Sequence, residues 1–138
     1  MLESLASLLY GFNIALQPQN LLYCFIGVTM GTLVGVLPGI GPTATIALVL
    51  PATFALNPIS AIIMLSGICY GAMYGGSTTS ILLNIPGEAS SVVTCFDGYK
   101  MARQGRAGAA LGISAFASFI AGTFSIFGLI LLAPTLAN

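Results

Sequence analysis

Charged residues are almost absent from this sequence, and their absence excludes an ordinary soluble domain. Three Lys or Arg and three Asp or Glu occur among 138 residues, so only 4% of the chain is charged, whereas soluble domains have about 25%. Six charges cannot keep a folded globule of this size in solution, and a chain that is 57% hydrophobic is expected to fold in lipid. We therefore predict an all-α, polytopic transmembrane protein.

Histidine is also absent, which removes the commonest metal ligand and the usual general base. The three cysteines, Cys24, Cys69 and Cys95, are odd in number and lack metal-ligand spacing, so they indicate apolar side chains or free thiols rather than disulfides or metal ligands. The net charge of zero gives no indication of a nucleic-acid partner. Because no acid pair sits in a plausible cleft, we expect no enzyme activity, no metal and no cofactor.

Long apolar runs bounded by Pro, Gly and Asn are what the chain does contain. They predict one transmembrane domain over residues 1–138, with membrane segments at about 21–37, 43–56, 58–83 and 107–133. The second segment reaches only about 21 Å, short of a bilayer core, so we interpret it as a half-helix or re-entrant element. A tilted, kinked full span is the alternative. Residues 1–12 indicate a short amphipathic helix at the interface rather than a signal peptide.

Five of the six charges lie in or beside one polar loop, residues 85–106. Its three cations, Lys100, Arg103 and Arg106, come just before the last apolar run and place the loop in the cytoplasm by the positive-inside rule. The N-terminus is then outside if the short second segment spans the bilayer, and inside if that segment is re-entrant. Asp97 is expected either to cap the helix that follows it or to pair with Lys100 or Arg103.

Glycines recur at intervals of four in two of the predicted spans: Gly27, Gly31 and Gly35 in the first, and Gly67, Gly71 and Gly75 in the second. Residues four apart share one helix face, so each span presents a groove of small residues that lets a neighbouring helix approach closely. Each set is followed by chain breakers and then by hydroxyl residues. This order indicates a faint internal repeat.

Interrupted spans point to a binding site. Gly75-Gly76 is predicted to break the segment 58–83, so that a half-helix begins near Ser77, as another begins at Pro42-Thr43. A helix that starts inside the bilayer presents unpaired N–H groups and a positive dipole end, which favour a carboxylate. The candidate substrate-binding residues supply such N–H groups, close backbone approach or hydroxyl donors: Gly39, Gly41, Pro42, Thr43, Thr45, Gly75, Gly76, Ser77, Thr78, Thr79 and Ser80.

Two alternatives stand beside this interpretation. Ser and Thr hydroxyls can instead bond back to carbonyl oxygens one turn earlier or across to a neighbouring helix. Backbone carbonyls freed at the breaks can also coordinate a small cation such as Na⁺. Asn84 and Glu88 follow the second break and are therefore our candidate ion-coupling residues, although Glu88 as a solvated loop carboxylate fits the sequence equally well.

Two stretches of the sequence resemble a known family. GTLVGVLPGIGPTATIALVLPATF and YGGSTTSILLNIPGEASSVVTCFDGYKMARQGRAGAALG, in this order, are similar to the large permease subunit (the TctA type) of the tripartite tricarboxylate transporters. The resemblance covers about residues 20–122. LPGIGP at 37–42 and GGSTTS at 75–80 match the two strongest motifs of the family. The resemblance implies that both motifs lie at the substrate path.

The resemblance also implies a bacterial inner-membrane, ion-coupled secondary uptake system for tricarboxylates or related small carboxylates, driven by Na⁺ or H⁺. Its implied partners are a periplasmic solute-binding protein and a small membrane subunit. Permeases of this family are several times longer than this chain, so we expect the N-terminal portion of a larger permease. A non-transporting membrane scaffold and a passive channel are the competing functions.

Overall fold

The computed structural model describes residues 2–136, with side chains for residues 7–130 and 132. All regular structure in these residues is helical and none is a strand, which confirms the all-α prediction. The elements are α1 (Leu2–Ala15), α2 (Pro18–Gly35), α3 (Gly41–Thr53), α4 (Pro58–Leu83), η1 (Ala89–Ser91), α5 (Val92–Met101), η2 (Ala102–Arg106) and α6 (Ala107–Leu136). Helix α4 and the helical stretch Ala89–Ile130 are long and apolar enough to cross a membrane.

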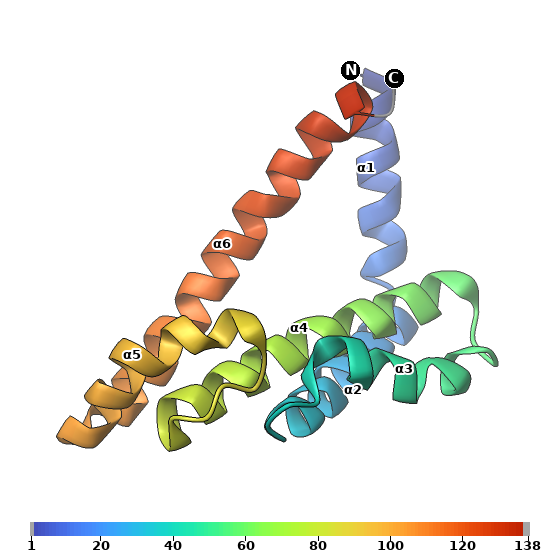
Figure 1. The fold of residues 1–138 in the computed structure, drawn as a ribbon. Coiled ribbons are helices and arrows are strands. Elements are labelled where there is room, and N and C mark those ends of the chain that lie inside the picture. The colour runs from blue at the N-terminus through green and yellow to red at the C-terminus, as the bar shows by residue number, and fades with distance from the viewer. Residues whose placement is uncertain (1, 137–138) are drawn as a thin grey trace.

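Helices α2, α3 and α4 lie against one another, while α1 and α6 project away from them (Figure 1). Helices α2 and α4 run in the same direction. Helix α3 leads from the end of α2 back to the start of α4. The tightest packing is between α2 and α4, and the two glycine sets make it possible. A Cβ at Gly31 would overlap the carbonyl oxygen of Ile68, and a Cβ at Gly71 would overlap that of Val28. The predicted grooves therefore interlock, so that each backbone lies in the groove of the other helix.

The beginnings of α2 and α4 are joined by a small buried polar cluster. The Ser60 hydroxyl donates to Asn20 Oδ1 at 2.6 Å, and Asn20 Nδ2 donates to the carbonyl oxygen of Ile14 at 2.7 Å. Asn20 and Ser60 are each 4% exposed. Because a buried amide must find partners, this cluster fixes the register of α2 on α4 and attaches the end of α1 to both.

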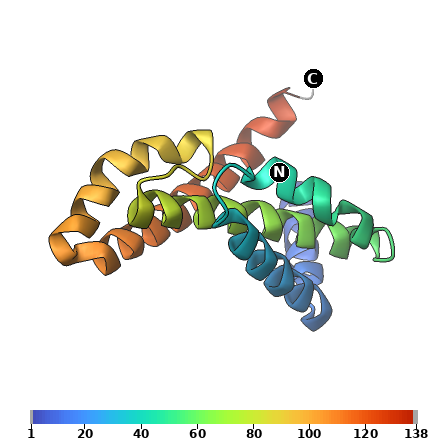
Figure 2. The ribbon, with the colours of Figure 1, turned by 60° about the horizontal axis from the view of Figure 1, so that its bottom comes forward.

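Helix α3 is short and begins partway along α4. The Thr79 hydroxyl of α4 reaches the Val36 carbonyl at the end of α2, so the α2–α3 connection, residues 36–40, lies beside α4 rather than beyond its end. Four residues after α3, Asn57 accepts a hydrogen bond from the N–H of Ile59 at 3.1 Å and caps α4. Figure 2 shows the α2–α3 connection next to the C-terminal half of α4.

Three sequence expectations are wrong. Helix α4 is not broken at Gly75-Gly76 but continues unbroken from Pro58 to Leu83. The predicted loop at 85–106 is mostly helical, because η1 and α5 fill it and pack along the end of α4. Asp97 lies in the interior of α5, whose N-cap residue is Ser91, so it caps no helix.

The turn between α5 and α6 has a physical explanation. Gly105 adopts φ +78°, a left-handed conformation that glycine reaches without steric cost, and the chain reverses there. Helix α6 then runs back past α5 and the end of α4, and it presents large apolar side chains such as Phe116, Phe119 and Phe124, each more than 70% exposed. A face of this kind is typical of a helix in contact with lipid or with other membrane helices.

Candidate functional site: cavities along the end of α4

A cavity of about 890 Å³ opens at the α2–α3 connection, and we call it the break cavity. Two segments far apart in the sequence form it, namely the start of α3 with the residues before it, and the loop between α4 and α5. The N–H of Gly39 donates to the carbonyl oxygen of Gly87 at 3.3 Å and joins the two segments. The lining residues are Gly39, Ile40, Gly41, Pro42, Thr43, Ala44, Ala47, Pro86, Gly87, Glu88, Ala89, Ser90 and Val92.

The first turn of α3 supplies an uncapped helix N-terminus to this cavity. Ile40 is the N-cap residue, and no side chain accepts a hydrogen bond from the N–H groups that follow. Pro42 lies in the first turn, where a missing N–H costs nothing. Gly39 and Gly41 adopt φ +85° and +54°, which is why the chain uses glycine to turn from α2 into α3. The positive end of the α3 dipole therefore lies at the wall of the break cavity.

The backbone of the connection is otherwise well satisfied by protein groups. The N–H groups of Val36 and Leu37 donate to carbonyls of the last turns of α2 at 3.1 and 2.9 Å. The carbonyl oxygen of Val36 accepts from the Thr79 hydroxyl at 2.9 Å. Irregular backbone survives in an apolar environment only when protein or cavity water satisfies it, and this connection meets that condition.

Glu88 is the acidic residue of the break cavity and is half-buried. The Ser90 hydroxyl donates to Glu88 Oε1 at 2.6 Å, and the N–H of Glu88 donates to Ser91 Oγ at 3.2 Å. These bonds hold the carboxylate at the start of η1, and Glu88 lines the same cavity as the start of α3. Asn84, the other candidate ion-coupling residue, ends α4 in a left-handed conformation with φ 59° and does not line this cavity.

The hydroxyl run on α4 does not begin a helix, and its hydroxyls bond back to their own helix. Ser77, Thr78 and Ser80 donate to carbonyl oxygens four residues earlier at 3.1, 3.0 and 2.9 Å. Thr45 of α3 does the same with Gly41 at 2.8 Å. The expected half-helix at Ser77 is wrong because a glycine costs a helix only about 1 kcal/mol, and Gly75 and Gly76 are used here for close packing.

Gly75 and Gly76 lie on the same turn of α4, and each leaves room for another part of the chain to pack against this helix. A Cβ at Gly75 would lie 2.5 Å from the Thr32 carbonyl oxygen of α2, and a Cβ at Gly76 would lie 3.4 Å from Gly87 Cα. The double glycine therefore lets α2 and the α4–α5 loop approach α4 together. Its effect on the break cavity is indirect, since it places Gly87 where it can accept the hydrogen bond from Gly39.

Replacing Thr79 with alanine is expected to destabilise the permease by about 0.5–1.5 kcal/mol, because the Val36 carbonyl would lose a part-buried hydrogen bond from the Thr79 hydroxyl. Thr78→Ala is the matched control, since the Thr78 hydroxyl bonds only to Tyr74 of its own helix. Thermal unfolding of the complete permease in detergent measures the difference. Equal melting temperatures for the two variants would show that the Thr79–Val36 bond does not hold the connection.

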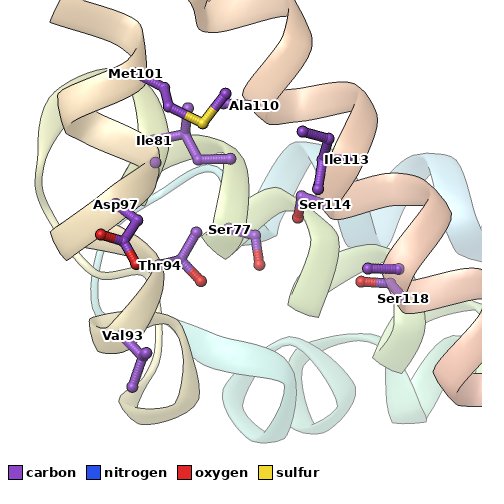
Figure 3. A pocket seen from close by; sticks show the side chains of 12 residues that line it. Ser77, Ile81, Val93, Thr94, Asp97, Met101, Ala110, Ile113, Ser114 and Ser118 are labelled. Carbon is purple, nitrogen blue, oxygen red and sulfur yellow. The ribbon is translucent and has the colours of Figure 1, made fainter.

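Two further cavities continue along α4 toward α6. A cavity of about 410 Å³, the middle cavity, shares Glu88 and Ser90 with the break cavity. A cavity of about 390 Å³, the Asp97 cavity, shares Ser77 and Ser118 with the middle cavity. The three cavities are therefore neighbours along α4, and Figure 3 shows the last of them between α4, α5 and α6.

The structure gathers some of the predicted site residues and separates others. Gly39, Gly41, Pro42, Thr43 and Glu88 line the break cavity, whereas the residues from Thr78 to Ser80 do not. Residues 86–92 form a second part of the cavity wall, and of these only Glu88 was predicted from the sequence. A signal for it was present, because the Pro-Gly pair at 86–87 repeats the Pro-Gly pair at 38–39, and each pair comes between a long helix and the start of the next one.

An all-α fold with two helices long and apolar enough to cross a membrane is consistent with a membrane protein. The chain belongs to the tripartite tricarboxylate transporter TctA family, which it matches over residues 21–138. The family resemblance seen in the sequence is thereby confirmed.

A relative from Agrobacterium vitis is similar over the whole chain. It is described as an uncharacterized 52.8 kDa protein in the TAR-I ttuC' 3' region and is 59% identical over 138 residues. These residues are 100% of the present chain and 28% of the relative. No solved structure matches the chain.

Proposed function

We propose that this chain is part of the permease of an ion-coupled, binding-protein-dependent secondary transporter, which carries tricarboxylates or related small carboxylates across the bacterial inner membrane. Membership of the TctA family supports the transport role. The observation that carries the proposal furthest is the uncapped start of α3 at the wall of the break cavity. A helix start in a low-dielectric environment attracts an anion without any cationic side chain.

The chemistry of the break cavity suits a carboxylate. Unpaired N–H groups of the first turn of α3 are donors, and the Thr43 hydroxyl adds another donor to the same wall. Gly39 and Gly41 carry no side chain, so a ligand can approach the backbone closely. No Lys or Arg lines this cavity, which avoids the cost of a buried cation.

Glu88 supports ion coupling. Its carboxylate lines the same cavity as the start of α3 and would repel an anionic substrate. A proton or a Na⁺ bound at or near Glu88 removes this repulsion, so that cation and carboxylate bind together more favourably than either alone. Asn84, at the end of α4, is a further candidate ligand of the coupling ion if the loop that follows it moves.

The proposed assembly includes a periplasmic solute-binding protein that delivers the carboxylate and a small membrane subunit beside the permease. The description of the family as a tripartite transporter supports both partners. The exposed apolar surface of α6 supports a position in the bilayer, in contact with lipid or with membrane partners.

Uptake of labelled citrate into vesicles that contain the complete permease and its partners tests the proposal. Thr43→Ala is expected to raise the half-saturating citrate concentration about 2–12-fold, the effect of one lost net hydrogen bond. Thr123→Ala is the control, because its hydroxyl bonds only to Phe119 of its own helix. The same assay on Ser77→Ala, Thr78→Ala and Thr79→Ala tests the GGSTTS run.

Two outcomes would overturn the proposal. Vesicles that accumulate no carboxylate from a panel of tricarboxylates and dicarboxylates would favour the scaffold function. Uptake that is unchanged when the Na⁺ and proton gradients are dissipated would favour a passive channel. An unaltered half-saturating concentration in Thr43→Ala would leave transport intact but remove the start of α3 from the binding site.

A further inference from the structure

We propose that the Asp97 cavity binds a monovalent cation, Na⁺, through the Asp97 carboxylate and the hydroxyl oxygens of Thr94, Ser77 and Ser114. This proposal rests on the transport function above and adds a cation position separate from Glu88. Three helices contribute: α5 supplies Thr94 and Asp97, α4 supplies Ser77, and α6 supplies Ser114. Figure 3 shows the four side chains around one cavity, with Ser118 farther along α6.

The composition of the cavity wall carries the proposal. Its polar side chains are one carboxylate and hydroxyls, with no nitrogen donor and no sulfur apart from Met101. Hard oxygen ligands are those that alkali and alkaline-earth cations prefer. A single carboxylate balances a single positive charge, whereas Ca²⁺ sites generally use several carboxylates. The arrangement therefore favours a monovalent cation.

The oxygen atoms are available to a cation. Ser77 donates its hydroxyl proton to the Met73 carbonyl at 3.1 Å, so its lone pairs remain free to accept. Within the described part of the chain, the side chains of Thr94, Asp97 and Ser114 form no hydrogen bond or ion pair. Lys100, one turn farther along α5, does not line this cavity and makes no ion pair with Asp97.

Close packing of α5 on α4 holds Asp97 in place. A Cβ at Gly98 would lie 2.7 Å from Ile81 Cγ1, so only glycine lets α5 approach α4 this closely at the residue after Asp97. Ile81 and Ala110 are 1% and 5% exposed and form the apolar end of the cavity. The Asp97 side chain itself is exposed, so a cation can reach its carboxylate from outside the cavity.

The position of the cavity suits ion coupling. It shares Ser77 with the middle cavity, and the middle cavity shares Glu88 with the break cavity. A cation at Asp97 and an anion at the start of α3 would thus be connected through neighbouring cavities along α4. Movement of Ser77 or of the α4–α5 loop on binding one ion would alter the wall of the cavity that binds the other.

Binding of ²²Na⁺ to the purified complete permease, measured without any carboxylate, tests the proposal. Asp97→Asn keeps the shape of the side chain and is expected to weaken Na⁺ binding at least tenfold, while Thr123→Ala should stay within twofold. Thr94→Val provides a second variant if Asp97→Asn does not fold, and we expect it to weaken binding about 2–12-fold.

The proposal is overturned if wild type shows no saturable Na⁺ binding, or if Asp97→Asn and Thr94→Val bind Na⁺ as wild type does. Loss of Na⁺ binding in Glu88→Gln together with wild-type binding in Asp97→Asn would also overturn it and move the site to the break cavity. Because the assay contains no carboxylate, a failure of citrate uptake leaves its result unchanged, and a failure of Na⁺ binding leaves the uptake result unchanged.

Discussion

Replacing Gly31 with leucine is expected to abolish the folded permease, with the yield of monodisperse protein falling about tenfold or more. Even a Cβ at this position would overlap the carbonyl oxygen of Ile68, so α2 and α4 would have to separate. Overpacking a core side chain costs about 1–3 kcal/mol, and here the obstacle is backbone, which cannot rotate away. In lipid, where apolar surface gains little from burial, close van der Waals packing is the main attraction between helices.

Fluorescence size-exclusion chromatography of the tagged complete permease measures this effect. Gly108→Leu is the matched control, because a Cβ at Gly108 meets no atom of the described residues within 4 Å. We expect the control to retain most of its monodisperse peak. A Gly31→Leu protein that elutes and melts like wild type would mean that α2 and α4 do not interlock through their glycines.

Replacing Gly87 with valine is expected to remove carboxylate uptake while leaving much of the protein folded. A side chain at Gly87 would overlap the Cα of Gly76, so the α4–α5 loop would have to move away from α4. The hydrogen bond from Gly39 to Gly87 would then be lost, and with it the join between the two walls of the break cavity. Misplacing a binding wall by even about 1 Å can cost two orders of magnitude in activity.

Citrate uptake normalised to the amount of folded permease separates this effect from misfolding. Gly11→Val serves as the control, since Gly11 has no described atom within 4 Å of a Cβ and lies on α1, away from the break cavity. We expect uptake below about one tenth of wild type for Gly87→Val. Uptake near wild type would show that the loop can shift without affecting transport.

The sequence was most informative where one residue type has one structural explanation. Asn57-Pro58 is a cap followed by a first-turn proline, and α4 begins there. The glycines at intervals of four predicted close packing, and Gly31 and Gly71 show it directly. Such signals are local, because the cap and the groove depend only on the residues that form them.

The sequence was misleading where the same residues have two structural uses. Gly75-Gly76 reads as a break, but the two glycines lie within α4 and admit α2 on one side and Gly87 on the other. Only tertiary structure distinguishes these uses, because the neighbours come from other parts of the chain. Apart from Glu88, the wall at residues 86–92 was missed for the same reason, since its polar character suggested a solvated loop rather than a cavity lining.

The five residues between α2 and α3 have an electrical consequence. Helix α2 ends there on carbonyl oxygens and α3 starts there on N–H groups, so the direction of the peptide dipoles reverses within residues 36–40. A negative pole and a positive pole therefore lie side by side at a connection whose residues are mostly exposed. If the proposed coupling holds, the start of α3 attracts the carboxylate and the end of α2 attracts the cation at the same connection.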